Sequence, residues 1–167
     1  MTNPRKPFRI NVGFIVHEEV GYSHEIPFEF DKAKLDDLEV SNLRGSVQIG
    51  RTPQGLILQG QFAADTTLEC VRCLKTFDHR MDWEITELYA FSKDSVSESG
   101  LILPDDMHID LAPMLREYAL LEVPISPIHD PECKGLCIEC GQDLNVEDCG
   151  HDQHSDDSPF SVLKKLL

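Results

Sequence analysis

The residues of this sequence whose type and spacing best suit metal binding are its six cysteines. Two pairs have the form Cys-x-x-Cys, at Cys70–Cys73 and Cys137–Cys140. Cys133 lies before the second pair, and Cys149 and His151 follow it. A short turn with two cysteines supplies two ligands at the spacing that zinc requires, and four such ligands complete a tetrahedron. The spacing therefore predicts structural Zn²⁺, because a full set of four leaves no coordination position for water.

Two sets of ligands satisfy this count. The primary prediction joins the two pairs across the chain, which would tie the first half to the C-terminal segment: Cys70, Cys73, Cys137 and Cys140. The second set is local to the C-terminal segment, with His151 in reserve: Cys133, Cys137, Cys140 and Cys149. The remaining single histidines are interpreted as surface or satisfied side chains, and they include His17, His24, His79, His108 and His129.

The elements that must position these cysteines are mostly strands before residue 92. Apolar alternation predicts strands over 8–16, 26–30, 43–49, 56–63 and 81–91, and a strand over 66–69 leads into the first cysteine pair. Pro53 and Gly55 predict a hairpin turn, with Gly55 free to adopt a positive φ. The fold class is α+β: a mainly antiparallel, barrel-like first half, one central helix after Asp110, a zinc-knuckle segment and a short terminal helix over 159–167.

One compact domain is expected overall, in three regions. Residues 1–91 form the antiparallel core with the first cysteine turn, 92–108 an acidic flexible loop, and 109–167 the helix, the cysteine-rich segment and the terminal helix. No apolar run reaches the roughly 18–20 residues of a membrane span, and the N-terminus does not resemble a signal peptide. A cytoplasmic protein without a membrane partner is expected, in which the thiols stay reduced.

The charge is strongly negative and unevenly distributed. The net charge is −15; residues 1–93 carry 14 acids and 11 bases, whereas residues 94–167 carry 16 acids and 4 bases. This excludes a protein that is basic throughout and coats nucleic acid by bulk charge. Candidate RNA contacts therefore lie in the balanced half: Arg44, Arg51, Arg72, Lys75 and Arg80. The alternative interpretation is that these cations are solubilising and pair with nearby acids.

The order of the motifs resembles a known family. The segments that carry the resemblance are 52–60, 68–74, 109–111, 133–145, 149–151 and 158–166, so it extends over nearly the whole chain. They resemble the bacterial and plastid YceD family, the large ribosomal RNA subunit accumulation proteins. The resemblance implies a role in accumulation or processing of large-subunit (23S) ribosomal RNA. It also implies ribosomal RNA or a pre-ribosomal particle as partner. Family members with the longer cysteine set often have cysteine where His151 stands.

Three functions follow from these observations, in order of preference. The first is a non-enzymatic ribosome-biogenesis factor with structural zinc. The second is an acidic binding module for a basic ribosomal protein, since a net charge of −15 suits a cationic partner. The third is an RNA-processing enzyme. The sequence contains no P-loop, no G-x-S-x-G, no G-x-G-x-x-G and no spaced pair of carboxylates, so neither an enzyme nor a small-molecule substrate is expected.

Overall fold

The computed structural model describes residues 6–151, and the chain divides there into two compact units. The sheet unit comprises residues up to 67 together with 78–125. The cysteine unit comprises residues 68–77 together with 126 onward. This division differs from the sequence prediction, because the first Cys-x-x-Cys turn belongs with the C-terminal cysteines and not with the β core. The expected terminal helix over 159–167 lies outside the described residues.

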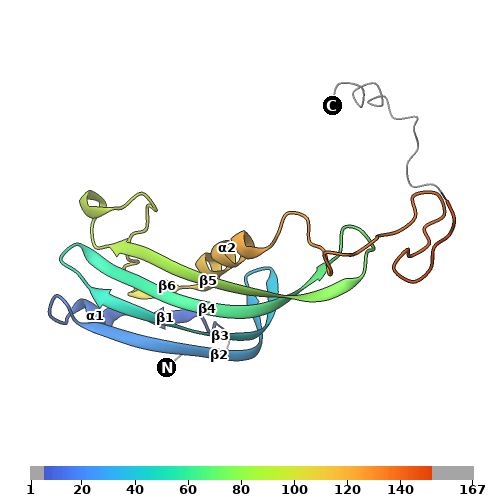
Figure 1. Ribbon diagram of the computed structural model, residues 1–167. Coiled ribbons are helices and arrows are strands. Elements are labelled where there is room, and N and C mark those ends of the chain that lie inside the picture. The colour runs from blue at the N-terminus through green and yellow to red at the C-terminus, as the bar shows by residue number, and fades with distance from the viewer. Residues whose placement is uncertain (1–5, 152–167) are drawn as a thin grey trace, which may run out of the picture. The chain divides into compact units, whose positions relative to one another are not determined.

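Four long strands pair in sequence order (Figure 1). They are β2 (Ser23–Leu35), β3 (Leu38–Arg51), β4 (Gly55–Glu69) and β5 (Thr76–Ala90). The mainly antiparallel prediction is confirmed, whereas the barrel is not. Among the described residues this sheet ends at β2 and β5, which do not pair with each other, so the sheet is open. Apolar alternation specifies which face of a strand is buried, but it does not specify whether the edges of a sheet meet.

The predicted hairpin between β3 and β4 is present, but its glycine serves a different purpose. The Thr52 N–H donates to the carbonyl oxygen of Gly55 at 2.9 Å, which closes the turn. Gly55 is not among the residues with positive φ. A Cβ at Gly55 would instead lie 2.2 Å from the carbonyl oxygen of Tyr89. The absence of a side chain is therefore required for close approach of the neighbouring backbone.

The shorter elements complete the sheet unit. β1 (Arg9–Asn11) pairs antiparallel with β6 (His108–Asp110), α1 (Gly13–Val16) follows β1, η1 (Lys93–Ser95) follows β5, and α2 (Ala112–Glu122) follows β6. The strand predicted over 8–16 ends early, because Asn11 Oδ1 accepts a hydrogen bond from the Gly13 N–H at 2.9 Å and the chain turns into α1. The central helix is present as predicted, with a proline in its first turn.

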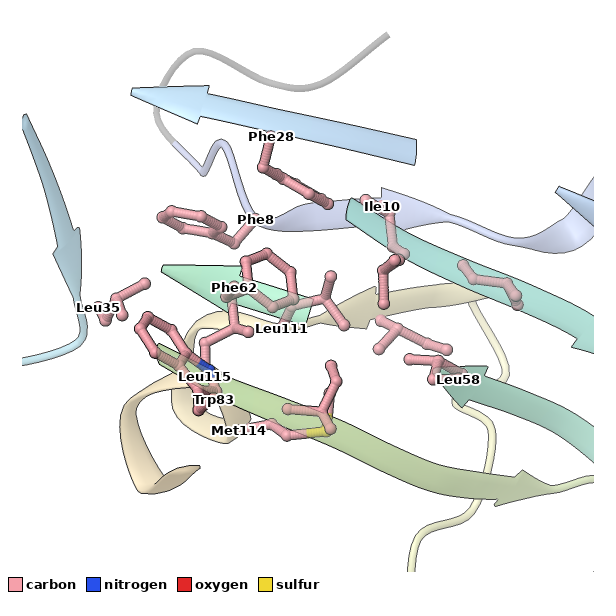
Figure 2. Packing of buried hydrophobic residues seen from close by; sticks show 14 of the residues in the cluster. Phe8, Ile10, Phe28, Leu35, Leu58, Phe62, Trp83, Leu111, Met114 and Leu115 are labelled. Atoms are coloured by element: carbon pink, nitrogen blue, oxygen red, sulfur yellow. The ribbon is translucent and has the colours of Figure 1, made fainter. Parts of the chain in front are cut away.

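The hydrophobic core lies between the long sheet, β1, β6 and α2 (Figure 2). Aromatic rings form its centre: the centroids of Phe8 and Phe28 lie 5.9 Å apart, and those of Phe62 and Trp83 lie 5.8 Å apart. Leu115 of α2 is fully buried against them, which fixes the helix on the sheet unit. No helix within residues 6–151 is long and apolar enough to cross a membrane.

Candidate metal centres

The two Cys-x-x-Cys turns have the same backbone geometry. In the first, the Leu74 N–H donates to the Cys70 carbonyl oxygen at 2.9 Å; in the second, the Gly141 N–H donates to the Cys137 carbonyl oxygen at 2.9 Å. Each turn also lies at the end of a hairpin, between β4 and β5 in one case and inside the Leu136–Asp143 bridge in the other. We call residues 70–75 the first knuckle and residues 137–142 the second knuckle.

A second hydrogen bond repeats in both knuckles. The amide of the first cysteine donates to the carbonyl oxygen five residues later, from Cys70 to Lys75 at 2.9 Å and from Cys137 to Gln142 at 2.8 Å. The residue after the second cysteine adopts a left-handed conformation, with φ of +60° at Leu74 and +74° at Gly141. Glycine adopts this conformation without penalty, whereas for leucine it is unfavourable.

The first candidate centre combines the first knuckle with a later segment of the cysteine unit. Its four side chains offer ligand atoms that all lie within 4.8 Å of one another: Cys70, Cys73, His129 and Cys133. The Cys70 and Cys133 sulfurs are 3.9 Å apart, and the Cys73 sulfur lies 3.4 Å from Nδ1 of His129. The three cysteines are buried, and Phe77, Ile128 and Leu136 pack against them.

The second candidate centre is built from the second knuckle and the residues that follow it. Its ligand atoms also lie within 4.8 Å of one another, and they come from Cys137, Cys140, Cys149 and His151. Nδ1 of His151 lies 3.8 Å from the Cys137 sulfur and 3.4 Å from the Cys149 sulfur. Cys137 is buried, whereas Cys140 and His151 are exposed. This centre is therefore more accessible to solvent than the first.

Both clusters fit a tetrahedral zinc site. Zinc–sulfur bonds of about 2.3 Å and zinc–nitrogen bonds of about 2.0–2.1 Å place ligands about 3.8 Å apart for two sulfurs and about 3.5 Å apart for sulfur and nitrogen. The four ligand-to-ligand distances given above, from 3.4 to 3.9 Å, match these values. Three thiols and one imidazole form a donor set typical of structural zinc, with no position left for water.

The structure groups the predicted ligands differently from either set proposed from the sequence. Cys70 and Cys73 lie with Cys133, and not with Cys137 and Cys140. The local set also divides, because Cys133 belongs to the first cluster while the other three cysteines and His151 form the second. The spacing within a knuckle identifies a pair of ligands, but only the tertiary fold decides which pairs meet. Zinc binding itself stays a prediction.

His129 is the candidate ligand that sequence reasoning missed. Its position as a single histidine predicts a surface side chain, yet its Nδ1 lies 3.4 Å from the Cys73 sulfur. The available signal was its position four residues before Cys133, at the start of a segment already rich in cysteine. Its ring is exposed and lies 6.5 Å from that of Phe77, in a tilted arrangement.

The first cluster favours at least one thiolate before any metal binds. Burial raises the pKa of Cys70, but hydrogen bonds from the side chain and backbone of His129 and from the amides of the knuckle outweigh it, and the pKa falls to about 5. Burial also raises the pKa of Cys73, and there it dominates. A thiolate is the form that binds metal, so Cys70 is prepared for ligation at neutral pH.

Polar side chains outside the first cluster hold Cys133 in place. Asn145 Nδ2 donates to the Cys133 sulfur at 3.5 Å and to Asp143 Oδ1 at 2.7 Å. Lys75 Nζ lies 2.7 Å from Asp143 Oδ2. This ion pair is the main cause of an Asp143 pKa of about 2. The hydrogen-bond chain therefore links the first knuckle, through Asp143 and Asn145, to a candidate ligand of the same centre.

Arg72 makes a second link between the knuckle and the Cys133 segment. Its Nη1 donates to the carbonyl oxygens of Cys133 at 2.9 Å and Pro131 at 3.3 Å. Its own carbonyl oxygen accepts from the Leu136 N–H at 3.0 Å. A Cβ at Gly135, where φ is +80°, would lie 3.0 Å from that carbonyl oxygen, so glycine allows the two segments to approach.

The five candidate RNA contacts have internal partners and are divided between the two units. Arg72 and Lys75 belong to the cysteine unit and make the contacts described above, whereas Arg44, Arg51 and Arg80 belong to the sheet unit. Arg44 lies 3.4 Å from Glu29, and Arg80 donates to both carboxylate oxygens of Asp82. RNA binding by these residues stays a prediction.

Arg51, at the end of strand β3, also contacts groups of its own chain. Its Nε donates to the Val16 carbonyl oxygen at 3.2 Å, and its guanidinium lies 4.3 Å from the ring centroid of Phe91. The depression that contains Arg44 also contains Asp82, Glu84 and Glu122, which makes its surroundings acidic. Three of the five cations, Arg44, Lys75 and Arg80, therefore pair with acids as the alternative interpretation expects, whereas Arg51 and Arg72 donate to backbone carbonyl oxygens.

Comparisons with known proteins identify relatives of this chain. The family model described as large ribosomal RNA subunit accumulation protein YceD matches residues 58–167, a range that includes both knuckles. An uncharacterized protein of Mycobacterium tuberculosis (strain H37Rv) is 30% identical over 163 residues, covering 92% of this chain and 74% of that protein. The uncharacterized protein YlbN of Bacillus subtilis is 27% identical over 158 residues, covering 86% and 92%.

A plant relative matches over a shorter range. The chloroplastic large ribosomal RNA subunit accumulation protein YCED homolog 1 of Arabidopsis thaliana is 33% identical over 63 residues, which cover 38% of this chain and 20% of the plant protein. No solved structure matches this chain.

Proposed function

The chain belongs to the YceD family of large ribosomal RNA subunit accumulation proteins, and from that membership we propose that it supports accumulation of large-subunit (23S) ribosomal RNA. The observation that carries this proposal is the family match over residues 58–167, because it contains all the candidate metal ligands. The site of action is the precursor of the large ribosomal subunit.

Zinc is the metal proposed for both centres, and its role is structural. Each centre offers three sulfurs and one nitrogen at tetrahedral spacing, which suits Zn²⁺. A bound ion would fix the knuckles to the segments that complete the centres. The residues of the cysteine unit then orient the knuckles and exclude water from the buried sulfurs. With all four positions taken by protein ligands, neither centre has a place for a reacting water.

A non-enzymatic mode of action is part of this proposal. It is supported by the closed ligand sets and by the absence of a defensible acid–base pair in the sequence. The purified, zinc-loaded chain is expected to leave a precursor large-subunit transcript intact in the presence of Mg²⁺. Metal-dependent cleavage or modification of that transcript by the wild type, abolished by a single substitution, would contradict this part of the proposal.

Depletion of the protein in its own host tests the proposed function directly. The expected result is a lower ratio of large-subunit to small-subunit ribosomal RNA, restored by the wild-type gene. A Cys73→Ser/Cys140→Ser variant, with one ligand removed from each centre, should restore it poorly. A Ser41→Ala variant changes a residue of the sheet unit and serves as the control for complementation. Normal large-subunit RNA after complete depletion would refute the proposal.

A basic ribosomal protein is the second candidate for the direct partner. The observation that favours it is that all five candidate RNA contacts have partners inside this chain, while the acidic residues outnumber the basic ones by two to one. Such a surface attracts cations and repels phosphate. RNase treatment of the purified complex distinguishes RNA from a ribosomal protein as the direct partner. Association through RNA is lost after the treatment, whereas direct association with a protein remains.

A further inference from the structure

The first knuckle presents two aliphatic side chains at its surface, next to two exposed cations that are bound to groups of the same unit. Its two cations, Arg72 and Lys75, are both hydrogen bonded within the cysteine unit. Its two aliphatic side chains are more than half exposed, 54% for Val71 and 57% for Leu74. We call Val71 and Leu74 the aliphatic tip. It combines two large apolar side chains in one turn whose conformation is fixed by the hydrogen bonds described above.

Folding alone does not account for the leucine in this tip. Leu74 has a φ of +60°, in the region that side chains other than those of glycine, asparagine and aspartate rarely adopt. The second knuckle has glycine at the equivalent position, Gly141, with the same hydrogen bond. Glycine is therefore sufficient for the backbone of the turn, and the turn does not need a leucine side chain. A leucine held in an unfavourable conformation, with most of its side chain in solvent, indicates a function at the surface.

The charge around the tip favours a cationic partner. The described residues of the cysteine unit carry seven acidic side chains against three basic ones, and two of those three bases are the paired Arg72 and Lys75. A Zn²⁺ ion bound by three thiolates and one neutral imidazole adds one negative charge at each centre. This environment repels the phosphates of RNA and attracts a basic segment of protein.

The chemistry of the tip also favours protein over RNA. Single-stranded RNA is bound largely by stacking of its bases on aromatic or guanidinium planes. Val71 and Leu74 have no such plane, and the Arg72 guanidinium donates to two carbonyl oxygens of its own unit. Aliphatic side chains instead gain from burial against other apolar side chains. Apolar contacts surrounded by opposite charge are typical of a specific protein interface.

We propose that the aliphatic tip is a docking surface for a basic protein segment that carries aliphatic side chains of its own. This inference rests on the proposed function, which places the chain at the precursor of the large subunit, and it names the partner class as a basic protein of that subunit. The tip supplies the apolar contact, and the acidic residues of the cysteine unit steer the partner and hold its cations.

The test uses the full, zinc-loaded chain and individually purified, RNA-free proteins of the host's large ribosomal subunit, titrated by calorimetry. The Val71→Thr/Leu74→Gly variant removes the apolar surface while relieving the backbone at position 74, so it should fold and retain zinc. The control is Val20→Thr/Leu121→Thr, which changes two exposed aliphatic residues of the sheet unit. At least one ribosomal protein should bind the wild type and the control alike, and the tip variant at least about tenfold more weakly.

Several results would overturn the inference. Equal binding by the tip variant and the wild type would exclude the tip as the contact. Binding to naked large-subunit RNA but to none of the proteins would assign the surface to RNA. A wild type that is dimeric in sedimentation, with a monomeric tip variant, would assign it to a second copy of the chain. If depletion lowers large-subunit RNA and the tip variant restores it fully, the docking inference fails while the proposed function stands.

Discussion

Asn145 and Cys133 are joined by a hydrogen bond from Nδ2 to sulfur of 3.5 Å. The other end of the amide is also held, because Asn145 Oδ1 accepts from the Lys134 N–H at 2.8 Å. A donor fixed in this way sets the direction of the sulfur that it contacts. Asn145 is therefore a positioning residue of the first centre, although it lies outside the set of ligands.

Replacing Asn145 with alanine should loosen metal at the first centre only. The loss of a partner to a ligating side chain typically weakens metal binding by about 10–100-fold. Competition with a chromogenic chelator measures this in a Cys140→Ser background, where only the first centre keeps its four ligands. Asn42→Ala is the control, because Asn42 donates to Asp65 in the sheet unit. Unchanged affinity in Asn145→Ala would show that the hydrogen bond does not support the ligand.

Two metal ions per chain are expected, and single substitutions should remove them separately. Cys73→Ser or His129→Ala should eliminate the first ion, and Cys140→Ser the second, because the two clusters share no ligand. Native mass spectrometry counts the ions directly. A chain that holds one ion, lost equally in Cys73→Ser and Cys140→Ser, would instead support the ligand set that joins both pairs.

The candidate site was partly predictable from the sequence. Local spacing identified the knuckles, since Cys-x-x-Cys specifies a turn whose geometry depends on neighbouring residues alone. The division of ligands was not predictable, because it depends on the segment around Cys133 meeting the β4–β5 hairpin through contacts such as Arg72 to the Cys133 carbonyl oxygen. His129 was missed because a single histidine carries no periodicity that distinguishes a ligand from a surface residue.

Local features of the fold were likewise predictable from the sequence, whereas features that depend on distant residues were not. The β3–β4 hairpin was predictable because Pro53 and the flanking apolar alternation specify it locally. The extension of β2 to Leu35 was not predictable, because residues 32–38 alone are equally compatible with a helical turn. In the structure Leu35 pairs with Leu38 of β3, and this pairing makes the segment a strand. Closure into a barrel depends on whether β2 and β5 meet, which no local pattern reports.

Substitutions at the two left-handed positions should differ in their effect on stability. Leu74→Gly removes an unfavourable conformation but adds freedom to the unfolded chain, so stability should stay equal or rise by up to about 1 kcal/mol. Gly141→Leu should lower it by about 1–2 kcal/mol, because leucine is disfavoured at a φ of +74°. Denaturant unfolding of the zinc-loaded proteins measures both. A clear loss of stability in Leu74→Gly would show that Leu74 contributes to folding.

The hydrogen bond from Tyr118 to Glu87 should give a contribution to stability that disappears at alkaline pH. The hydroxyl donates to Oε1 at 2.9 Å, and this bond, together with partial burial, raises the pKa of Tyr118. A raised pKa means that the contribution is present below pH ~10, the usual tyrosine value, and is lost as pH rises through the folded value. Tyr118→Phe should therefore cost about 0.5–1.5 kcal/mol at pH 7.

The difference between the wild type and Tyr118→Phe should shrink as the pH rises above ~10. Urea unfolding at intervals between pH 7 and 11 gives the required free energies. Tyr22→Phe, at an exposed tyrosine, controls for general effects of removing a hydroxyl. A difference that stays constant across this range would show that the bond to Glu87 does not depend on the protonated hydroxyl.

Removal of metal should unfold the cysteine unit and leave the sheet unit folded. The buried cluster of the cysteine unit consists of three candidate ligands with three apolar side chains, so without metal little remains to offset its chain entropy. The sheet unit has an extensive core that contains Trp83, the single tryptophan of the chain. With excess chelator, proteolysis should begin within residues 126–151 while tryptophan emission stays native.

The reciprocal variant completes this test. Phe62→Ala removes a ring that lies 5.8 Å from that of Trp83, and truncation of a buried phenylalanine typically costs about 3–5 kcal/mol. The tryptophan emission should then change at lower denaturant concentration, while the zinc content under native conditions stays at two. A shift of the wild-type emission to that of the unfolded chain on chelation alone would show that the two units fold as one, with the metal centres supporting the sheet as well.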